Sequence, residues 1–134
     1  MTHYLLDTNT ISFLIRERYP TLNAHARQVG MSNMAISVIT EAELLHGLAL
    51  KPHATTLANR VHSLLNQLSV LAWDRKEAAS YAHLKVMMQR HGIMLAHQDL
   101  LIAAHAYSLD LTLITNDQAF FKLQPFLDVE DWTV

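Results

Sequence analysis

Short apolar runs alternate with helical segments along the whole chain, and this alternation constrains the fold more than any other feature. Such runs are typical of buried strands. They are expected at residues 3–7, 34–39, 69–73 and 111–115, with a last strand in "LDVEDW". Strands separated by helices predict a parallel sheet with helices on both faces. We therefore expect a three-layer α/β fold with a central parallel sheet of four or five strands.

The segments between these runs carry helical patterns. The clearest lies over residues 54–68, where apolar residues recur on one helical face, namely Leu57, Val61, Leu64, Leu65 and Leu68. Helices are also expected over 10–17, 21–29, 41–50, 75–90 and 98–109, with a short one in "NDQAFF". Thr40 is the expected N-cap of the helix that starts at residue 41. Glu43 then lies at the spacing of a capping box.

Length and composition limit the class of protein. A chain of 134 residues, 51% of them hydrophobic, predicts a single domain over residues 1–134 with a full core. The absence of cysteine excludes disulfides and thiolate metal sites. No apolar run approaches the roughly 20 residues that span a bilayer, and no secretion signal is visible. We expect a soluble, cytoplasmic protein that does not interact with membranes.

Four acidic residues stand near the carboxyl ends of the expected strands. Asp7 ends the first strand, and Glu43 lies about one helical turn beyond the second. Asp99 begins the helix that precedes "LTLIT", and Asp117 follows that strand by two residues. In open α/β sheets, ligands bind outside the carboxyl ends of the strands. We therefore expect these four carboxylates to gather at one edge of the sheet.

Each acid alone has an ordinary explanation as a turn residue, a cap or a helix N-terminal acid. Together they predict a metal site, because crowded carboxylates repel each other and a divalent cation offsets their charge. Ligands that are all oxygen suit Mg²⁺ or Mn²⁺ better than Zn²⁺. A metal-bound water is a nucleophile for phosphodiesters. The pattern therefore predicts metal-dependent phosphodiester hydrolysis.

Other chemistries find little support. The nine histidines form no i,i+3 or i,i+4 pair, and only His97, near Asp99, is a candidate for the site. A phosphatase of the haloacid dehalogenase type needs a second aspartate two residues after the first, where this chain has Asn9. A nuclease that acts on DNA and a catalytically silent binding module remain as alternatives.

Four segments resemble the PIN-domain ribonucleases, specifically the VapC toxins of bacterial type II toxin–antitoxin pairs. They are "LLDTNTISFLI", "ISVITEAELLHG", "HQDLLIAAHAYSLDLTLITND" and "FLDVEDW", in the order and spacing of that family. The loop "HGIMLAHQD" departs from the Gly-Arg-Pro-Ile-Gly-like loop of many relatives. That difference leaves the substrate contacts of this loop open.

The resemblance implies a PIN-like fold and an endoribonuclease with a four-carboxylate Mg²⁺ or Mn²⁺ site. The implied metal and catalytic acids are Asp7, Glu43, Asp99 and Asp117. Glu41 does not occupy the matching place. The implied supporting residues are Asn9, Thr115 and Asn116.

The family also implies partners. These are a VapB-type antitoxin, whose C-terminal segment lies in the active-site groove, a second copy of the chain, and an RNA substrate, often tRNA. Operator DNA is contacted only through the antitoxin. The net charge of −2 agrees with this, because without the four site acids 10 basic residues stand against 12 − 4 = 8 acidic ones. Basic residues that could follow an RNA backbone include Arg16, Arg18, Lys51, Arg60, Lys85 and Arg90.

Overall fold

The computed structural model describes residues 2–134, and its centre is a five-stranded parallel sheet. The strands are β1 (Tyr4–Leu6), β2 (Met34–Ser37), β3 (Ser69–Leu71), β4 (Thr112–Ile114) and β5 (Val129–Glu130). Their order across the sheet is β3-β2-β1-β4-β5, and every neighbouring pair is parallel. The predicted α/β fold is confirmed.

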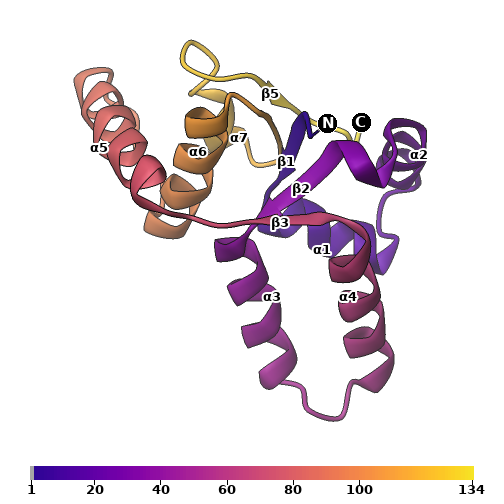
Figure 1. Ribbon diagram of the computed structural model, residues 1–134. Coiled ribbons are helices and arrows are strands. Elements are labelled where there is room, and N and C mark those ends of the chain that lie inside the picture. Colours follow the sequence, from indigo (N-terminus) through magenta and orange to yellow (C-terminus); the bar gives the residue numbers. More distant parts are fainter. Residues whose placement is uncertain (1) are drawn as a thin grey trace.

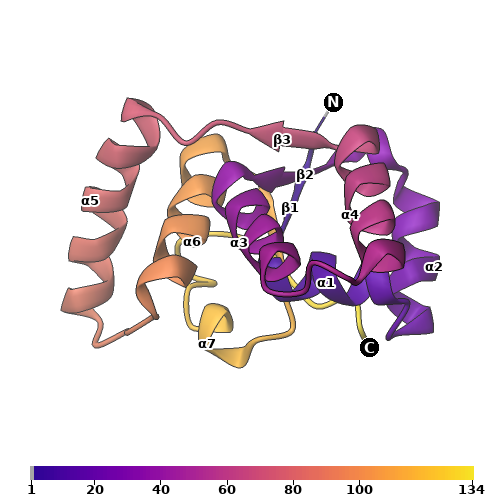
Figure 2. The same ribbon diagram turned by 90° about the horizontal axis from the view of Figure 1, so that it is seen from below.

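Helices lie on both sides of the sheet (Figures 1 and 2). They are α1 (Thr8–Arg16), α2 (Pro20–Val29), α3 (Val38–Ala49), α4 (Thr55–Gln67), α5 (Arg75–Arg90), α6 (His97–Leu109) and α7 (Gln118–Phe121). A short 3₁₀ turn, Met31–Asn33, leads into β2. Helices α5, α6 and α7 form one layer, while α1, α2 and α4 lie together on the opposite side (Figure 2). None of the helices in residues 2–134 is long and apolar enough to cross a membrane.

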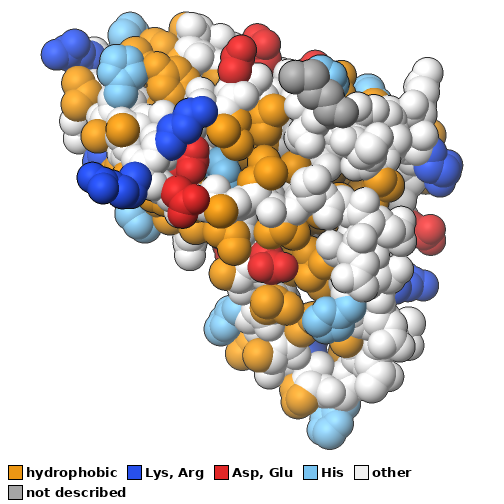
Figure 3. Space-filling view, in the orientation of Figure 1, with side chains coloured by type: hydrophobic (Ala, Val, Ile, Leu, Met, Phe, Trp, Pro, Cys, Tyr) orange, Lys and Arg blue, Asp and Glu red, His pale blue; other side chains and the backbone are white. Residues whose placement is uncertain are grey.

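Helices α3 and α4 extend away from the sheet as a helical hairpin (Figure 1). Because α3 follows directly from the last residue of β2, this hairpin begins at the carboxyl edge of the sheet. Its surface carries apolar side chains among histidines and uncharged polar groups (Figure 3). The hairpin therefore flanks the edge at which the acids were expected.

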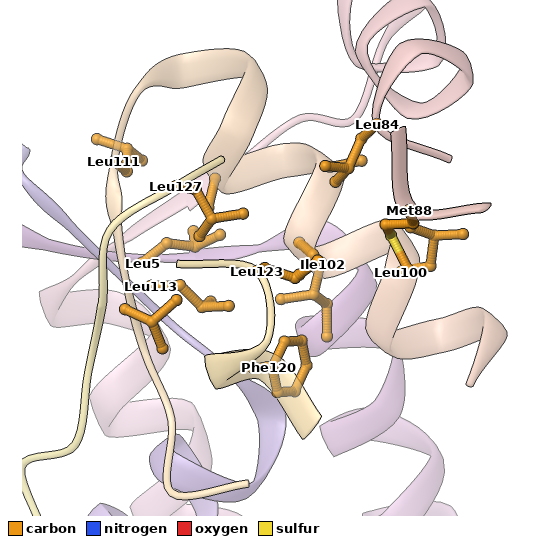
Figure 4. Packing of buried hydrophobic residues seen from close by; sticks show 14 of the residues in the cluster. Leu5, Leu84, Met88, Leu100, Ile102, Leu111, Leu113, Phe120, Leu123 and Leu127 are labelled. Atoms are coloured by element: carbon orange, nitrogen blue, oxygen red, sulfur yellow. The ribbon is translucent and has the colours of Figure 1, made fainter. Parts of the chain in front are cut away.

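Alternation along the strands separates two hydrophobic clusters. Leu5 pairs with Leu113 across β1 and β4, and both face the cluster beneath α5, α6 and α7 (Figure 4). Leu6 pairs with Ile114, and both belong to the cluster beneath α1, α2 and α4. Successive residues of a strand point to opposite faces, so one short strand serves both clusters. All four side chains are fully buried.

The order of the strands identifies the ligand-binding crevice. From β1 the chain crosses to β2 on one side, while β4, much later in the sequence, pairs with β1 on the other side. Ligands of doubly wound sheets bind at such a switch point, beyond the carboxyl ends of the strands. Here Asp7 follows β1 and Thr115 follows β4.

The boundaries of α3 correct one sequence prediction. The helix begins at Val38, and Ser37 is its N-cap, with its hydroxyl oxygen accepting a hydrogen bond from the Ile39 amide at 3.1 Å. Thr40 lies buried in the first turn, so the predicted cap at Thr40 and the capping-box role of Glu43 are wrong. The β-branched pair at 38 and 39 favours strand by propensity, but the serine before it supplies a better place to start the helix.

Candidate functional site

Asp7 is the most buried of the four candidate acids, with 3% of its surface exposed. It is the N-cap of α1, and its Oδ1 accepts a hydrogen bond from the Thr10 amide at 2.8 Å. The hydroxyl of Thr115 donates to its Oδ2 at 2.6 Å. Both carboxylate oxygens are therefore held by donors that carry no charge.

Burial raises the pKa of the Asp7 carboxyl above its ordinary value. The two hydrogen-bond donors oppose this shift, and the negative charge of Asp117 adds to it. The net direction is upward, because removal from water costs the charged form more than two neutral donors return. The charged form of this carboxylate is therefore destabilised when no cation is near.

Thr115 links the first acid to the fourth. Its hydroxyl donates to Asp7 and accepts a hydrogen bond from the Asp117 amide at 3.0 Å. Asp117 in turn is the N-cap of α7, and its Oδ1 accepts from the Ala119 amide at 3.0 Å. One buried hydroxyl therefore contacts both the carboxylate after β1 and the backbone of the acid after β4.

Glu43 is positioned from α3 by a neighbour of Asp7. The Thr8 hydroxyl donates to Glu43 Oε1 at 2.6 Å and lies 3.1 Å from the Thr40 hydroxyl. Because the only hydroxyl proton of Thr8 goes to the carboxylate, Thr40 is the donor in the second contact. Glu43 is therefore tied to α1 rather than to the backbone of its own helix.

Asp99 lies in the first turn of α6 and is half-buried. Burial raises the pKa of its carboxyl. The negative charges of the other three acids raise this pKa further, Asp117 most, followed by Asp7 and Glu43. The fold thus brings all four predicted carboxylates near enough for the charges of the other three to raise the pKa of Asp99.

The side chains have not converged on one point, however. Within residues 2–134, no group of three acidic or histidine side chains is arranged closely enough to hold one ion. The acids are therefore too far apart to share one ion, yet their charges still act on Asp99. These two observations are compatible. Charges act over greater distances than ligand bonds, and two of the carboxylates are turned onto donors at Thr8 and Ala119. The donor set, carboxylates without cysteine or histidine, still matches a hard divalent cation.

The other predicted residues behave differently from one another. Thr115 contacts an acid directly, as described above. In the described part of the chain, the side chains of Asn9 and Asn116 make no hydrogen bond to the acids; Asn9 is exposed. His97 is also exposed, and its ring lies against Tyr81, with 6.3 Å between centroids.

Two threonines of the site, Thr8 and Thr40, were not predicted. Thr8 stands directly after Asp7, so the sequence did contain a signal for it. Thr40 was assigned to a cap, which hid its contact with Thr8.

A buried polar network on α6 was missed as well. His105 is fully buried, and its Nδ1 lies 2.8 Å from the Ser37 hydroxyl oxygen. Burial lowers the pKa of this histidine, while the charge of Glu77 partly opposes the shift. Glu77 accepts hydrogen bonds from Ser108 at 2.8 Å and from the Asp74 amide at 2.9 Å. These two separate sets of hydrogen bonds tie α6, which carries Asp99, to the start of the helix that carries Glu43 and to α5.

Two hollows beside α1 differ in their relation to the site. The larger, about 760 Å³, lies between α1, α2 and α4, and none of the four acids lines it. The smaller, about 230 Å³, lies between α1, α3 and α4, and both Thr8 and Glu43 line it. Of these two hollows, the first is the larger, but the second is the one that reaches a candidate acid, Glu43.

Comparisons with known proteins agree with this arrangement. The family model described as "PIN domain" matches residues 4–124. Ribonuclease VapC2 of Haemophilus influenzae is 30% identical over 98% of this chain and 99% of its own length. The tRNA(fMet)-specific endonuclease VapC of Salmonella typhimurium is 31% identical, with the same coverage.

The fold is likewise similar to solved structures. In the DNA-bound VapBC complex of Salmonella typhimurium, the matching chain has a TM-score of 0.88 and 30% identity, over 98% of this chain and 99% of that one. The sheet order and these likenesses over nearly the full length agree with each other. The chain belongs to the PIN-domain family, among its VapC toxins.

Proposed function

We propose that this protein is the toxin of a type II toxin–antitoxin pair and acts as a metal-dependent endoribonuclease. The observation that carries the proposal is the position of Asp7, Glu43, Asp99 and Asp117 around the carboxyl edge of β1 and β4, where burial and then the charges of the other three raise the pKa of Asp99. The names of the relatives, a ribonuclease and a tRNA endonuclease, support the same chemistry.

The proposed metal is Mg²⁺ or Mn²⁺, held by these carboxylates. When bound, such an ion lowers the pKa of a coordinated water and offsets charge that develops on the phosphate. Thr115 and the Thr10 amide keep Asp7 in one orientation, and Thr8 does the same for Glu43. Burial and the charges of the other three acids raise the pKa of Asp99, so its charged form is less stable when the ion is absent.

We infer RNA, with tRNA as the first candidate, as the substrate. The relative from Salmonella typhimurium is named for a tRNA, and it is 31% identical to this chain. The basic residues that remain outside the four-acid site supply cations for a phosphate backbone. In this proposal the protein acts in the cytoplasm, where such RNAs occur.

A VapB-type antitoxin is the proposed inhibitor. Solved relatives are described as VapBC complexes, some of them bound to DNA. We propose that the DNA contact of such a complex comes through the antitoxin, because the toxin site itself presents carboxylates.

A second copy of the chain is the other proposed partner. Helix α3 exposes a row of apolar residues at spacings of four, three and four, namely Val38, Ala42, Leu45 and Ala49. Val38 and Leu45 are 36% and 42% exposed, and Figure 3 shows apolar side chains on the α3–α4 hairpin. An apolar helical face on the surface is typical of an interface. Leu45→Glu should shift the sedimentation coefficient to that of a monomer, whereas Asn59→Glu on α4 should not.

The activity is tested with purified protein and total cellular RNA. Cleavage, read as new 5′ ends, should occur with Mg²⁺ or Mn²⁺, stop in EDTA and be absent in Asp99→Asn. Single-stranded DNA of matched length serves as the alternative substrate. Cleavage that persists in EDTA would contradict the proposed metal site, and preference for DNA would favour the alternative nuclease.

A further inference from the structure

Gly47 lies inside α3, where glycine is an unfavourable residue. A glycine within a helix destabilises it by roughly 0.5–1 kcal/mol relative to alanine. Its backbone does not require glycine, because the positive φ angles in residues 2–134 belong to Glu17, Gly30, Gly92 and Asp110. A Cβ built on Gly47 would have nothing within 4 Å. Neither conformation nor packing in this chain explains the residue.

The space above Gly47 is the smaller hollow beside the acids. We call this hollow of about 230 Å³ the α1–α3 pocket; its wall includes Thr8, Asn9, Ser12, Glu43 and Gly47. Glu43 and Gly47 are four residues apart and so lie on the same face of α3. A larger side chain at position 47 would therefore occupy the pocket next to a candidate metal ligand.

The pocket has an apolar side and a cationic side. Ile15, Leu44 and Leu48 are among its apolar residues, and Arg16 and Lys51 are its two cations. Both cations are exposed, one at the end of α1 and the other just after α3. An apolar wall suits a base, and flexible cations suit a phosphate.

We propose that the α1–α3 pocket binds the nucleotide adjacent to the phosphodiester that is cleaved. The base packs against the apolar wall, Asn9 and Ser12 offer hydrogen bonds to it, and Arg16 and Lys51 contact the neighbouring phosphate. Gly47 leaves the space that this nucleotide fills. The inference rests on the proposed ribonuclease function and adds a specificity site to it. RNA is favoured over a peptide because two cations border a pocket that is continuous with Glu43.

Two substitutions at position 47 separate filling the pocket from changing the helix. Gly47→Ala removes the helix penalty and adds one methyl group, whereas Gly47→Phe fills the pocket. Neither should lower the melting temperature, because the Cβ position is open and both residues form helices better than glycine does. Mn²⁺ affinity, measured by calorimetry, should be unchanged in both.

RNA cleavage should distinguish the two variants. With total cellular RNA at saturating Mn²⁺, Gly47→Phe should raise the half-saturating RNA concentration roughly tenfold or more, as expected for loss of the contacts of one base. Gly47→Ala should raise this concentration far less, because one methyl group leaves most of the pocket open. A destabilised helix would also lower the melting temperature and change the Mn²⁺ affinity. Loss of a nucleotide contact would change neither.

The cations are tested by the salt dependence of binding. The Asp99→Asn protein is mixed with a fluorescent RNA fragment that spans the most frequent cut. Arg16→Gln and Lys51→Gln should each reduce the slope of log Kobs against log salt by about 0.7, the value for one contact to single-stranded RNA. Lys76→Gln, an equal change of charge on α5, should leave the slope unchanged.

The outcomes keep the inference apart from the proposed function. Normal cleavage and binding by Gly47→Phe would overturn the inference, while Mn²⁺-dependent cleavage by the wild type would still support the ribonuclease. If the wild type cleaves no RNA, both fail. If Gly47→Phe cleaves normally but escapes inhibition by its antitoxin, the pocket binds a peptide and the inference is likewise overturned.

Discussion

Replacing Thr115 by valine should show how strongly one hydroxyl holds the acids together. Valine has the shape of threonine and keeps the methyl packing, but it removes the donor to Asp7 Oδ2 and the acceptor for the Asp117 amide. The Thr115 side chain is 1% exposed and Asp7 is 3% exposed, so water replaces neither contact easily. The substitution therefore isolates two buried hydrogen bonds.

The magnitude follows from these two contacts. A hydrogen bond to a charged group contributes about 1.5–3 kcal/mol, and an ordinary one about 1 kcal/mol. Thr115→Val should therefore lower the free energy of unfolding by roughly 2–4 kcal/mol. Thr115→Ser keeps the hydroxyl and loses one buried methyl group, which costs about 1 kcal/mol. The serine variant is the matched control.

The assay is urea unfolding in EDTA, followed by circular dichroism at several pH values. At pH 8 the valine variant should have a lower midpoint than the serine variant, with the same slope. Loss of the donor raises the pKa of Asp7 further. Since a raised carboxyl pKa means that the folded state gains protons more readily, the difference between the variants should shrink as the pH falls through that pKa.

Equal midpoints for the two variants at pH 8 would refute the reasoning. That result would mean that Asp7 finds another donor, or that its carboxyl is protonated in the folded protein even at that pH. A lower midpoint with normal Mn²⁺ affinity would instead separate the structural role of the hydroxyl from metal binding.

Three further predictions address the acids and the buried network. Asp99→Asn should abolish RNA cleavage and, in EDTA at pH 8, raise the free energy of unfolding by roughly 0.5–2 kcal/mol, measured as a higher melting temperature. Because the pKa of Asp99 is raised in the folded state, this gain should disappear as the pH falls through that pKa. Burial alone would raise the pKa of Glu77, but hydrogen bonds from Asp74 and Ser108 lower it. Glu77→Gln should therefore lower the free energy of unfolding in urea by about 1–2 kcal/mol at pH 7, and the difference from the wild type should vanish at acid pH. A C-terminal antitoxin peptide that carries arginine should compete with Mn²⁺ in calorimetry and bind Asp99→Asn more weakly by roughly 2–5 kcal/mol; equal affinity for both proteins would place inhibition elsewhere.

Asp7 illustrates why the crowded acids should not all behave alike. Because crowded carboxylates repel each other, removing one of them should relieve repulsion. Asp7 also caps α1 and accepts from Thr115, so its loss removes two favourable contacts together with one charge. Asp99 accepts no hydrogen bond from another side chain in residues 2–134 and is the better position for a stabilising substitution.

The sequence predicted the sheet, and the placement of the four acids near the ends of strands, because both depend on local pattern and on one topological rule; their role as metal ligands stays a prediction. Each strand is a short apolar run, and the acids follow from the position of strand ends. The start of α3 was wrong because Val38 and Ile39 resemble strand residues, and only the chain direction after β2 shows that they are helical. Local propensity could not decide between Ser37 and Thr40 as the cap.

Contacts between segments that are far apart in the chain could not be predicted from a single sequence. His105 stands among alanines in an apolar helix, and nothing nearby indicates that it meets Ser37, 68 residues away. Thr8 and Glu43 are 35 residues apart, and their hydrogen bond exists only because α1 and α3 pack together. Such pairs follow from the packing of helices and not from pattern.

The chemistry of the donors around the acids is compatible with the proposed cation site. Asp7 is satisfied by an amide and a hydroxyl, and Glu43 by a hydroxyl, so their hydrogen-bonding needs are met without positive charge. The charges that act on Asp99 all come from other acids. A lysine or arginine in the cluster would have stabilised the empty site, but it would also compete with a metal for the same oxygens. Neutral donors orient the carboxylates and leave their negative charge in place, which is the arrangement that the proposed divalent ion would need.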